Sequence, residues 1–414
     1  MEEIRTKVFS LPGVSMTPQN NKIKKIIAVT GIRSEVDILL PIVATLKKNN
    51  FDVSVILSGA HLAEFHGNTI TGLQKAGIKI IDRVDSLFMT GRKTLRIKGL
   101  GNLILGISQT IEREKPDLLL VVGDREEAIA TALVGNYMDV IVAHIGGGDT
   151  VYGNADDPIR HSVSRLAHIH LAINRMHTKV LEATGEEKFR IHFIGNPVLD
   201  LDKDVKHIDL KKLSQVLDFD IVSNPYVILI QHPLSSERSS SYKQASTVLN
   251  TLELMGDKHG LKTIGIYPNT DPGAFDIIQA ISEHINSINI KFYKNLDRAT
   301  FINVIRNAKA LVGNSSMGIV EAPYYGLPVV NIGNRQLGRI NSGNVVFVKH
   351  NPKFIQSEIE RACFDEDYRK QVEKNRSDFG DGKAASRAVQ VLSNINPNDP
   401  KWLIKKLNLF NLLP

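Results

Sequence analysis

The stretch GNSSMGIVEA, from Gly313 to Ala322, decides how this chain folds. The apolar run Ala308 to Val312 leads into it and predicts a buried strand of a parallel sheet. A tight polar turn follows, and then a helix whose N-cap would be Ser315 or Ser316. A strand, a short turn and a helix form the repeating unit of α/β proteins.

The same turn has the composition of an anion site. Free backbone N–H groups at the start of a helix, together with the hydroxyls of Ser315 and Ser316, favour phosphate. Glu321 is expected five or six residues into that helix, just over one turn along it, within reach of a ribose if the serines hold phosphates. The alternative is an ordinary capped turn between a strand and a helix.

Composition narrows the class of protein. The 414 residues favour two domains, and 42% hydrophobic with 23% charged residues is typical of globular proteins. Cys363 is the single cysteine, so an internal disulfide and a cysteine-built metal site are excluded, and a reducing cytoplasm is expected.

Neither a membrane nor a nucleic acid is predicted as a partner. Residues 1–21 carry mixed charges without an apolar core, so we expect a loose leader rather than a signal peptide. No apolar run approaches the roughly 20 residues that span a bilayer. The net charge of +7 comes from scattered lysines and arginines without a basic stripe interleaved with aromatic residues. An anionic small molecule needs only a few well-placed cations.

The chain opens with a strand, a glycine turn and a helix. Lys25 to Thr30 predicts the strand, and the helix extends through Lys48. The turn lacks the GxGxxG pattern, so a dinucleotide site is not expected. Arg33 lies just after the strand's carboxyl end, where it either faces a ligand or is a solvated loop arginine.

Strand and helix signals alternate along the rest of the chain, which predicts two α/β domains with parallel sheets. Further strands are predicted at 52–57, 117–122, 140–143, 167–173, 189–194, 226–231, 262–266, 288–292 and 345–348, and residues 83–95 are predicted to form a loop. A turn-rich segment near residue 200 divides the chain. We expect an N-terminal domain over 22–200, completed by helices within 380–414, and a second domain over 201–379. The ligand is expected between them.

Acidic residues collect where strands of the first half end. Asp124 follows the apolar strand DLLLVV, and Asp149 follows a glycine run after the next strand. Asp156 and Asp157 precede a helix that carries His161 in its first turn. Capping that helix is the alternative role for the acid pair, but the whole cluster exceeds what a cap requires.

Together these motifs resemble the UDP-N-acetylglucosamine 2-epimerase family over about residues 25–390. The segment GNSSMGIVEAPYYGLPVVNIGNRQLGR is similar to the family's nucleotide-binding segment. Members that retain the nucleotide carry a GTRPE-like first turn, whereas hydrolysing members carry SGxHL and a GGD/E…DDxIRH block. This chain has Ser58 to Leu62 (SGAHL), Gly147 to Asp149 and Asp156 to His161 (DDPIRH), so it resembles the hydrolysing type.

The resemblance implies a fold of the glycosyltransferase-B type, with two Rossmann-like domains and the active site in the cleft between them. It implies elimination of UDP to give a 2-acetamidoglucal, followed by addition of water with inversion at C2. The products would be UDP and N-acetylmannosamine, a precursor of sialic-acid-type sugars. No cofactor and no metal are implied, and because relatives are often dimers or tetramers, a homodimer or homotetramer is expected.

The resemblance also implies site residues. The catalytic set would be Asp124 (the GD aspartate), Asp156 (the first acid of the DD pair), Asp149, His232 and His161. The nucleotide set would be Arg33, His232, Ser315, Ser316, Gly318, Glu321, Asn269 and Arg339, with the two arginines facing the phosphates or closing the cleft. Many relatives have an acid where this chain has Gly146, so the assignment of individual acids stays open.

Three other functions compete with this one. The same reaction on UDP-2,4-diacetamido-2,4,6-trideoxyglucose or on a GDP-sugar would serve a legionaminic acid route. A glycosyltransferase on the same fold would need a separate acceptor and fewer carboxylates in the first domain. A nucleotide-sugar sensor would bind without turnover.

Overall fold

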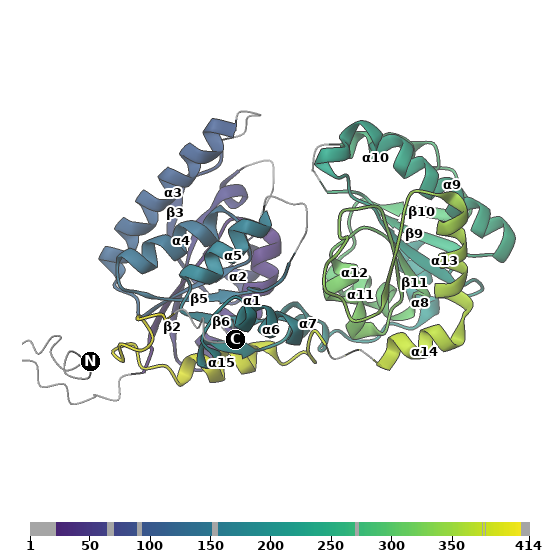
Figure 1. The fold of residues 1–414 in the computed structure, drawn as a ribbon. Helices are drawn as coiled ribbons and strands as arrows, with labels where there is room; N and C mark the ends of the chain where they lie inside the picture. The colour runs from purple at the N-terminus through teal and green to yellow at the C-terminus, as the bar shows by residue number, and fades with distance from the viewer. Residues whose placement is uncertain are drawn as a thin grey trace, which may run out of the picture.

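The computed structural model describes residues 22–63, 70–88, 93–150, 156–269, 273–374, 376 and 378–406. Figure 1 shows two lobes side by side, each built on one sheet: the N-terminal lobe runs from purple to teal, and the second is mostly green. Every strand pair in both sheets is parallel. The predicted α/β class with two parallel, Rossmann-like sheets is therefore confirmed.

The first sheet has seven strands in the order β3-β2-β1-β4-β5-β6-β7. Its strands are β1 (Lys25–Thr30), β2 (Asp52–Ser58), β3 (Lys79–Val84), β4 (Leu118–Val122), β5 (Ile141–Ile145), β6 (Ile169–Ala172) and β7 (Ile191–Phe193). All five residues of β4 and all five of β5 are buried, because helices cover both faces of the sheet.

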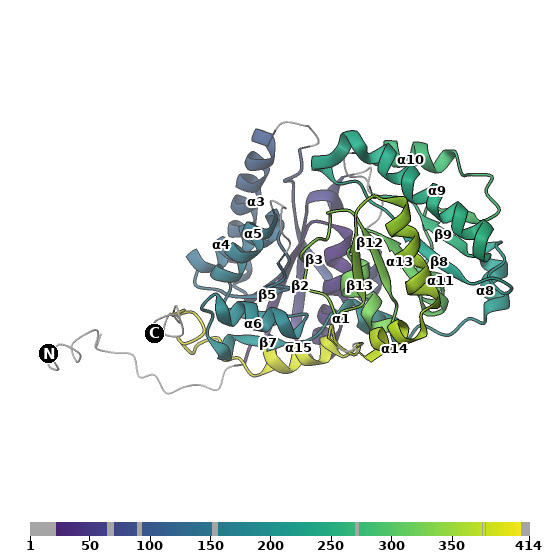
Figure 2. The ribbon, with the colours of Figure 1, turned by 45° about the vertical axis from the view of Figure 1, so that its right-hand side comes forward.

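Helices from both ends of the chain cover this sheet. They are α1 (Arg33–Lys48), α2 (Thr71–Lys75), α3 (Lys93–Glu114), α4 (Glu126–Tyr137), α5 (Asp156–Leu166) and α6 (Arg175–Ala183), with 3-10 turns η1 (Gly59–Leu62) and η3 (Lys188–Arg190). Helix α15 (Ala384–Ser393), near the end of the chain, packs against α1 and shares its core. Figure 2 shows α15 in yellow along the lower edge of this lobe.

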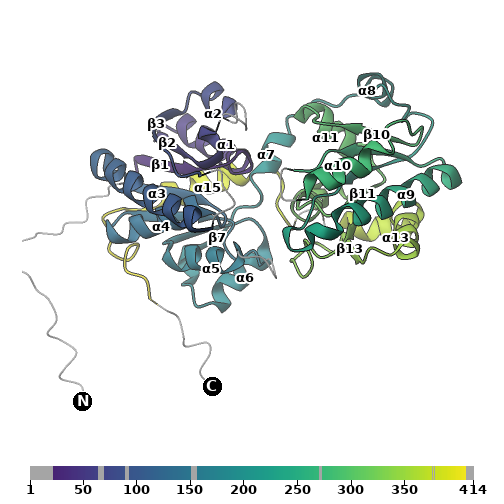
Figure 3. The same ribbon diagram turned by 90° about the horizontal axis from the view of Figure 1, so that it is seen from above.

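The second sheet has six strands in the order β10-β9-β8-β11-β12-β13. Its strands are β8 (Tyr226–Ile230), β9 (Lys262–Ile266), β10 (Ile290–Tyr293), β11 (Ala310–Gly313), β12 (Val329–Ile332) and β13 (Val345–Val348). Its helices are α8 (Leu210–Leu217), α9 (Ser241–His259), α10 (Ala274–Ser282), α11 (Arg298–Asn307), α12 (Met317–Val320), α13 (Pro352–Phe364) and α14 (Glu366–Lys374), with 3-10 turns η4 (Ser235–Ser240) and η5 (Ala322–Tyr325). Seen from above in Figure 3, α7 (Val198–Asp202) lies between the lobes.

Two local expectations were wrong. Strand β3 reaches Val84, into the segment expected to be a loop, and only one of its six residues is buried. It escaped notice because an edge strand pairs on one side only and can carry polar residues. The helix after Ser316 ends at Val320, because Pro323 has no N–H to donate to the carbonyl four residues earlier.

Within the part of the chain that the structure describes, no helix combines the length and the apolar character needed to cross a bilayer.

Candidate functional site

The strand order fixes where a ligand would bind. In each sheet the order reverses between two neighbouring strands, β1 and β4 in the first lobe and β8 and β11 in the second. Loops that leave the carboxyl ends of such strands diverge to opposite faces of the sheet and leave a crevice, which is where open α/β sheets bind ligands. The sequence-predicted residues Asp124, His232 and Ser315 lie in these loops.

In the second lobe, the amide of Asn314 joins the two loops at the reversal. Its Oδ1 accepts a hydrogen bond from the His232 backbone N (2.7 Å), and its Nδ2 donates to the His232 carbonyl (2.8 Å). The neighbouring Gly313 has φ +125°, and a Cβ there would overlap the Ile230 carbonyl. Only glycine allows this close approach of the two backbones.

The tautomer of His232 follows from one hydrogen bond. The backbone N–H of Asn269 donates to His232 Nδ1 at 3.1 Å. A ring nitrogen that accepts a hydrogen bond carries no proton, so the neutral imidazole of His232 is protonated at Nε2. The two predicted residues His232 and Asn269 are thus brought together.

The serine turn, Ser315 and Ser316, directly follows Asn314 in the chain and is partly exposed. Ser315 Oγ accepts weakly from the Met317 backbone N at 3.4 Å, and Ser316 is the N-cap of α12 without a side-chain cap bond. A Cβ at Gly318 would crowd side chains of β11 and β12, so this glycine lets the short helix lie close on the sheet.

Glu321 lies where α12 meets η5, and its side chain is 17% exposed. Burial raises the pKa of Glu321 to about 7; the guanidinium of Arg298, 4.0 Å away, lowers it, and the carboxylates of Asp202 and Asp37 raise it. Glu321 therefore changes charge near neutral pH.

In the first lobe, Asp124 forms an ion pair with Arg160 of α5. Arg160 Nη1 also donates to the carbonyl of Gly146 at 3.0 Å, which ties the ends of β4 and β5 to α5. Gly146 has φ +83°, a conformation that strains residues with a side chain. Glycine therefore suits this position, and the sequence offers no carboxylate there.

Asp149 is buried and bonds with both carboxylate oxygens to Arg339 of the second lobe. His177 Nε2 lies 3.6 Å from Asp149 Oδ1. Burial alone would raise the pKa of Asp149, but the guanidinium groups of Arg339 and Arg160 outweigh it and lower the pKa below the usual range. Asp149 is therefore a carboxylate at all ordinary pH values.

The remaining predicted residues lie around this centre. His161 Nε2 is 3.7 Å from Asp157 Oδ2, one turn earlier on α5. Asp156 is the first residue of α5, and its side chain lies outside the described part of the structure. Arg33 is the first residue of α1 and is exposed.

Sequence reasoning missed a pair of buried glutamates at the reversal between β1 and β4. Glu35 Oε2 accepts from Gly31 N (2.8 Å) and Thr30 Oγ1 (3.0 Å), and burial raises its pKa to about 8, with the carboxylate of Glu127 raising it further. The Glu127 carboxyl lies over Gly31 and Gly59, where any Cβ would overlap it. The spacing of these residues carried no signal for their burial.

His61, from the SGAHL motif, completes this cluster. Its Nε2 lies 3.2 Å from Thr30 Oγ1. Burial lowers the pKa of His61 to about 4, so the ring is neutral near pH 7. The hydroxyl of Thr30 thus connects a neutral histidine with the carboxyl of Glu35.

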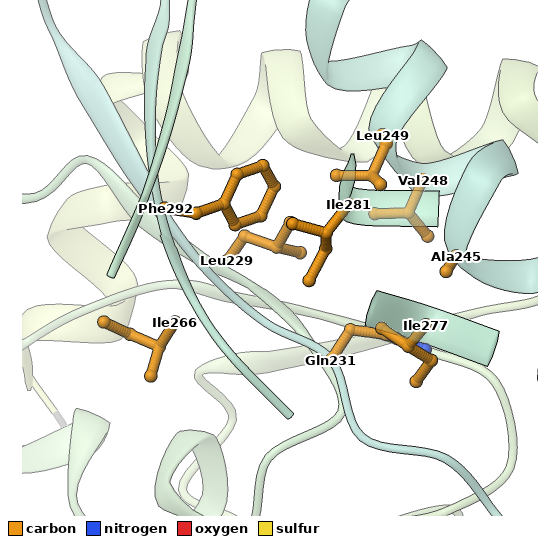
Figure 4. Close-up of a pocket in the computed structure, with 9 residues that line it drawn as sticks. All are labelled: Leu229, Gln231, Ala245, Val248, Leu249, Ile266, Ile277, Ile281 and Phe292. Carbon is orange, nitrogen blue, oxygen red and sulfur yellow. The ribbon is translucent and has the colours of Figure 1, made fainter. Parts of the chain in front are cut away.

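A void in the second lobe, shown in Figure 4, is separate from these residues. It has a volume of about 10 Å³ and is lined mainly by apolar side chains of β8, β9, α9 and α10. That space admits at most a single water molecule. It is therefore no binding site for a nucleotide or a sugar.

Comparisons with known proteins agree on one family. Residues 44–393 match the UDP-N-acetylglucosamine 2-epimerase family. The UDP-N,N'-diacetylbacillosamine 2-epimerase (hydrolyzing) of Legionella pneumophila is 30% identical over 90% of this chain and 96% of its own length. The UDP-N-acetylglucosamine 2-epimerase of Neisseria meningitidis is 32% identical over 82% of this chain and 88% of its own length.

A solved structure shows the same fold. The UDP-GlcNAc 2-epimerase from Neisseria meningitidis, bound to UDP-GlcNAc, superimposes with a TM-score of 0.75. The alignment covers 89% of this chain and 99% of that chain, at 20% sequence identity.

Proposed function

Because this chain belongs to the UDP-N-acetylglucosamine 2-epimerase family, we propose that it is a hydrolysing 2-epimerase that converts UDP-N-acetylglucosamine and water into N-acetylmannosamine and UDP. The observation that carries the proposal is the position of Asp124 and Asp149. Each is paired with an arginine at the edge of the first sheet, and the arginine on Asp149 comes from the lobe that holds the serine turn. Sugar chemistry and diphosphate binding would thus meet at one place.

The first step is an elimination. A carboxylate removes the proton from C2. The electron pair of the broken C2–H bond forms the C1=C2 double bond, and the C1–O bond breaks with UDP as the leaving group. Both carboxylate oxygens of Asp149 accept hydrogen bonds from Arg339, and its side chain is only 2% exposed. The side chain of Asp124 is 19% exposed, so Asp124 is the better candidate for a base that must reach the substrate. Asp149 then serves as a fixed negative charge that holds Arg339 and keeps the lobes together.

The leaving diphosphate needs hydrogen-bond donors. The serine turn supplies hydroxyls and backbone N–H groups, and His232, protonated at Nε2, is placed beside it by Asn314. Donors that are already fixed stabilise developing charge without reorganisation. Glu321 would accept hydrogen bonds from the ribose, and Arg33 would approach the phosphates from the first lobe.

The second step adds water to the glucal. The oxygen of water bonds to C1, and a proton is added to C2. This proton arrives on the face opposite to the one from which the first proton was removed, so the configuration at C2 is inverted. Asp156 and His161, on the first turn of α5, are the candidate acid and proton carrier for this step. The product is the free sugar, and no bond between the sugar and UDP is formed again.

A second substrate has specific support. The Legionella relative is named for UDP-N,N'-diacetylbacillosamine, and its identity to this chain is nearly that of the relative named for UDP-N-acetylglucosamine. The same elimination and hydration would act on a sugar that carries a 4-acetamido group and a 6-methyl group. Sugars of this kind lead toward nonulosonic acids such as sialic or legionaminic acid.

The decisive experiment uses each UDP-sugar separately in deuterated water, followed by proton NMR. A free 2-epimeric sugar deuterated at C2, together with UDP, supports the proposal and identifies the substrate. A 2-epimer still attached to UDP would move the chain to the nucleotide-retaining type. Transfer that requires an added acceptor would identify a glycosyltransferase instead.

We also propose that the protein acts in the cytoplasm as a homodimer or homotetramer. Two exposed apolar side chains on one face of α3, Ile97 (68%) and Leu105 (65%), supply a candidate interface, together with Tyr137 (88%) at the end of α4. Light scattering of the double variant Ile97→Glu/Leu105→Glu tests this face. A wild-type monomer, or an unchanged oligomer in the variant, would contradict it.

A further inference from the structure

The segment 399–406, close to the end of the chain, lies against the first lobe. The fully buried Arg190 holds its backbone: Nη1 donates to the Trp402 carbonyl (2.8 Å), and Nη2 donates to those of Lys401 (2.6 Å) and Ile404 (2.8 Å). The rings of Trp402 and Phe189 add an edge contact at 5.4 Å. The segment is thus fixed by partners more than 200 residues earlier in the chain.

Lys405 extends from this segment to the C-terminal end of α5. Its Nζ donates to the carbonyls of Ser164 (3.1 Å), Arg165 (2.8 Å) and Ala167 (2.6 Å). It also pairs at 2.8 Å with the buried carboxylate of Glu186. The last carbonyls of a helix have no partner within the helix, and a cation at that end is favoured by the helix dipole.

Helix α5 also connects to the candidate catalytic acid, Asp124, through side chains of its own. Arg160 of α5 pairs with Asp124. Further along the same helix, Ser164 Oγ lies 3.2 Å from His144 Nδ1, and His144 Nε2 lies 2.7 Å from the carbonyl of Gly123, the residue before Asp124. Burial lowers the pKa of His144 to about 3, so the ring stays neutral and can donate to that carbonyl.

We propose that Lys405 is a positioning residue: by fixing the C-terminal end of α5, it fixes Arg160 and, through Arg160, the carboxylate of Asp124. This inference rests on the proposed function for its kinetic readout. The competing role is local, in which Lys405 only anchors the segment 399–406. The two differ in whether α5 loosens when the lysine is lost.

The surroundings of Lys405 make its charge sensitive to pH. The ammonium group faces Glu186, Arg165 and Arg190, with His168 and His170 on the neighbouring turn and strand. Burial lowers the pKa of Lys405 to about 8; Arg165 and Arg190 lower it too, and Glu186 opposes them. Above pH 8 the amine has two N–H donors for four acceptors and leaves Glu186 without this cation.

The test compares three full-length variants: Lys405→Met, Lys405→Arg and the control Lys406→Met, whose side chain is exposed. Hydrogen exchange of the α5 amides is the first readout, and kcat and KM on the UDP-sugar are the second. We expect Lys405→Met to speed exchange in α5 about tenfold and to lower kcat about tenfold with KM within twofold. Lys405→Arg should recover most of both and remove any loss of rate that the wild type shows above pH 8, because arginine stays charged.

Faster exchange in 399–406 with unchanged exchange in α5 would overturn the proposal and establish the local role. A change of the same size in Lys406→Met would also overturn it, because the effect would then not depend on the buried ammonium. If the wild type proves inactive on every UDP-sugar, the proposed function fails, but the exchange experiment still decides whether Lys405 holds α5.

Discussion

Asp149 and Arg339, separated by 190 positions in the chain, form an ion pair with two hydrogen bonds that joins the two lobes. The side chains are 2% and 11% exposed, so the pair is largely shielded from solvent. Asn196 makes a second polar contact between the lobes, because its Nδ2 donates to the Val320 carbonyl at 2.9 Å. Apolar side chains of the second lobe, Ile319 and Phe347 among them, also pack against the core of the first lobe. The ion pair adds a polar contact whose loss should be measurable.

Asp149→Asn should destabilise the protein by roughly 3 kcal/mol, because a buried guanidinium that loses its charged partner keeps its desolvation cost. Urea unfolding measures this loss. Asp149→Asn combined with Arg339→Gln should cost less than the sum of the single changes, since neither charge is then left unpaired. As the control, Asp218→Asn removes a carboxylate that is 97% exposed and pairs with Lys291, and should leave the stability nearly unchanged, because solvent screens exposed ion pairs. Equal losses of stability in Asp149→Asn and Asp218→Asn would show that the ion pair between the lobes contributes no more than an exposed one.

The affinity for UDP should rise with pH around neutrality. A ribose hydroxyl donates to a carboxylate, and Glu321 becomes one only as the pH rises through its raised pKa of about 7. Calorimetric titration of UDP between pH 5.5 and 8.5 measures this rise. Glu321→Gln should bind UDP more weakly, and its affinity should not change with pH. A wild-type affinity that stays constant over this pH range would contradict the prediction.

The same residue predicts a change in stability. The folded-state pKa of Glu321 lies above the usual 4.5, so the folded state holds an extra proton between those values and loses stability as the pH rises through that window. At pH 8 Glu321→Gln should therefore be more stable than the wild type, by about 2 kcal/mol. At pH 4 the difference should vanish, and unfolding curves at both values check the sign.

Gly31→Ala should impair both folding and turnover, because the added Cβ would overlap the buried carboxyl of Glu127. We expect a loss of about 2 kcal/mol, as for other overpacked sites, measured by thermal unfolding. Gly31→Ala combined with Glu127→Ala removes the overlap and should recover part of that stability.

Gly101→Ala is the matched control for this change. Gly101 lies within α3 with no atom near its would-be Cβ, so alanine should be neutral or stabilise the helix by up to about 1 kcal/mol. A similar loss of stability in both variants would show that the Glu127 carboxyl is not the obstacle.

Turnover should survive EDTA at millimolar concentration. The proposed elimination stabilises the leaving diphosphate with side-chain cations and backbone donors, so it needs no divalent ion. The described residues contain no group of three or more histidine, cysteine, aspartate or glutamate side chains suited to a metal. Loss of activity that returns on adding Mg²⁺ would show the mechanism to be incomplete.

The sequence by itself determined the fold class and the placement of the loops. Short apolar runs such as DLLLVV, each followed by a polar turn and a helix, predict strands covered on both faces, and the polar residues after them are then expected at the carboxyl edge of a parallel sheet. That reasoning placed Asp124 and Ser315 directly after strands, and the structure shows that those strand ends lie at the two reversals of strand order. It needed only local periodicity, which survives in a single sequence.

The tertiary structure decided which of these groups meet. The pairing of Asp149 with Arg339, the burial of Glu35 and Glu127, and the contact of Lys405 with α5 each join segments far apart in the chain. Local spacing carries no information on such contacts, because they depend on how two sheets and the returning end of the chain are packed. Burial then sets the charge of each group, so the pKa of a carboxyl such as Glu321 follows from the fold rather than from its neighbours in sequence.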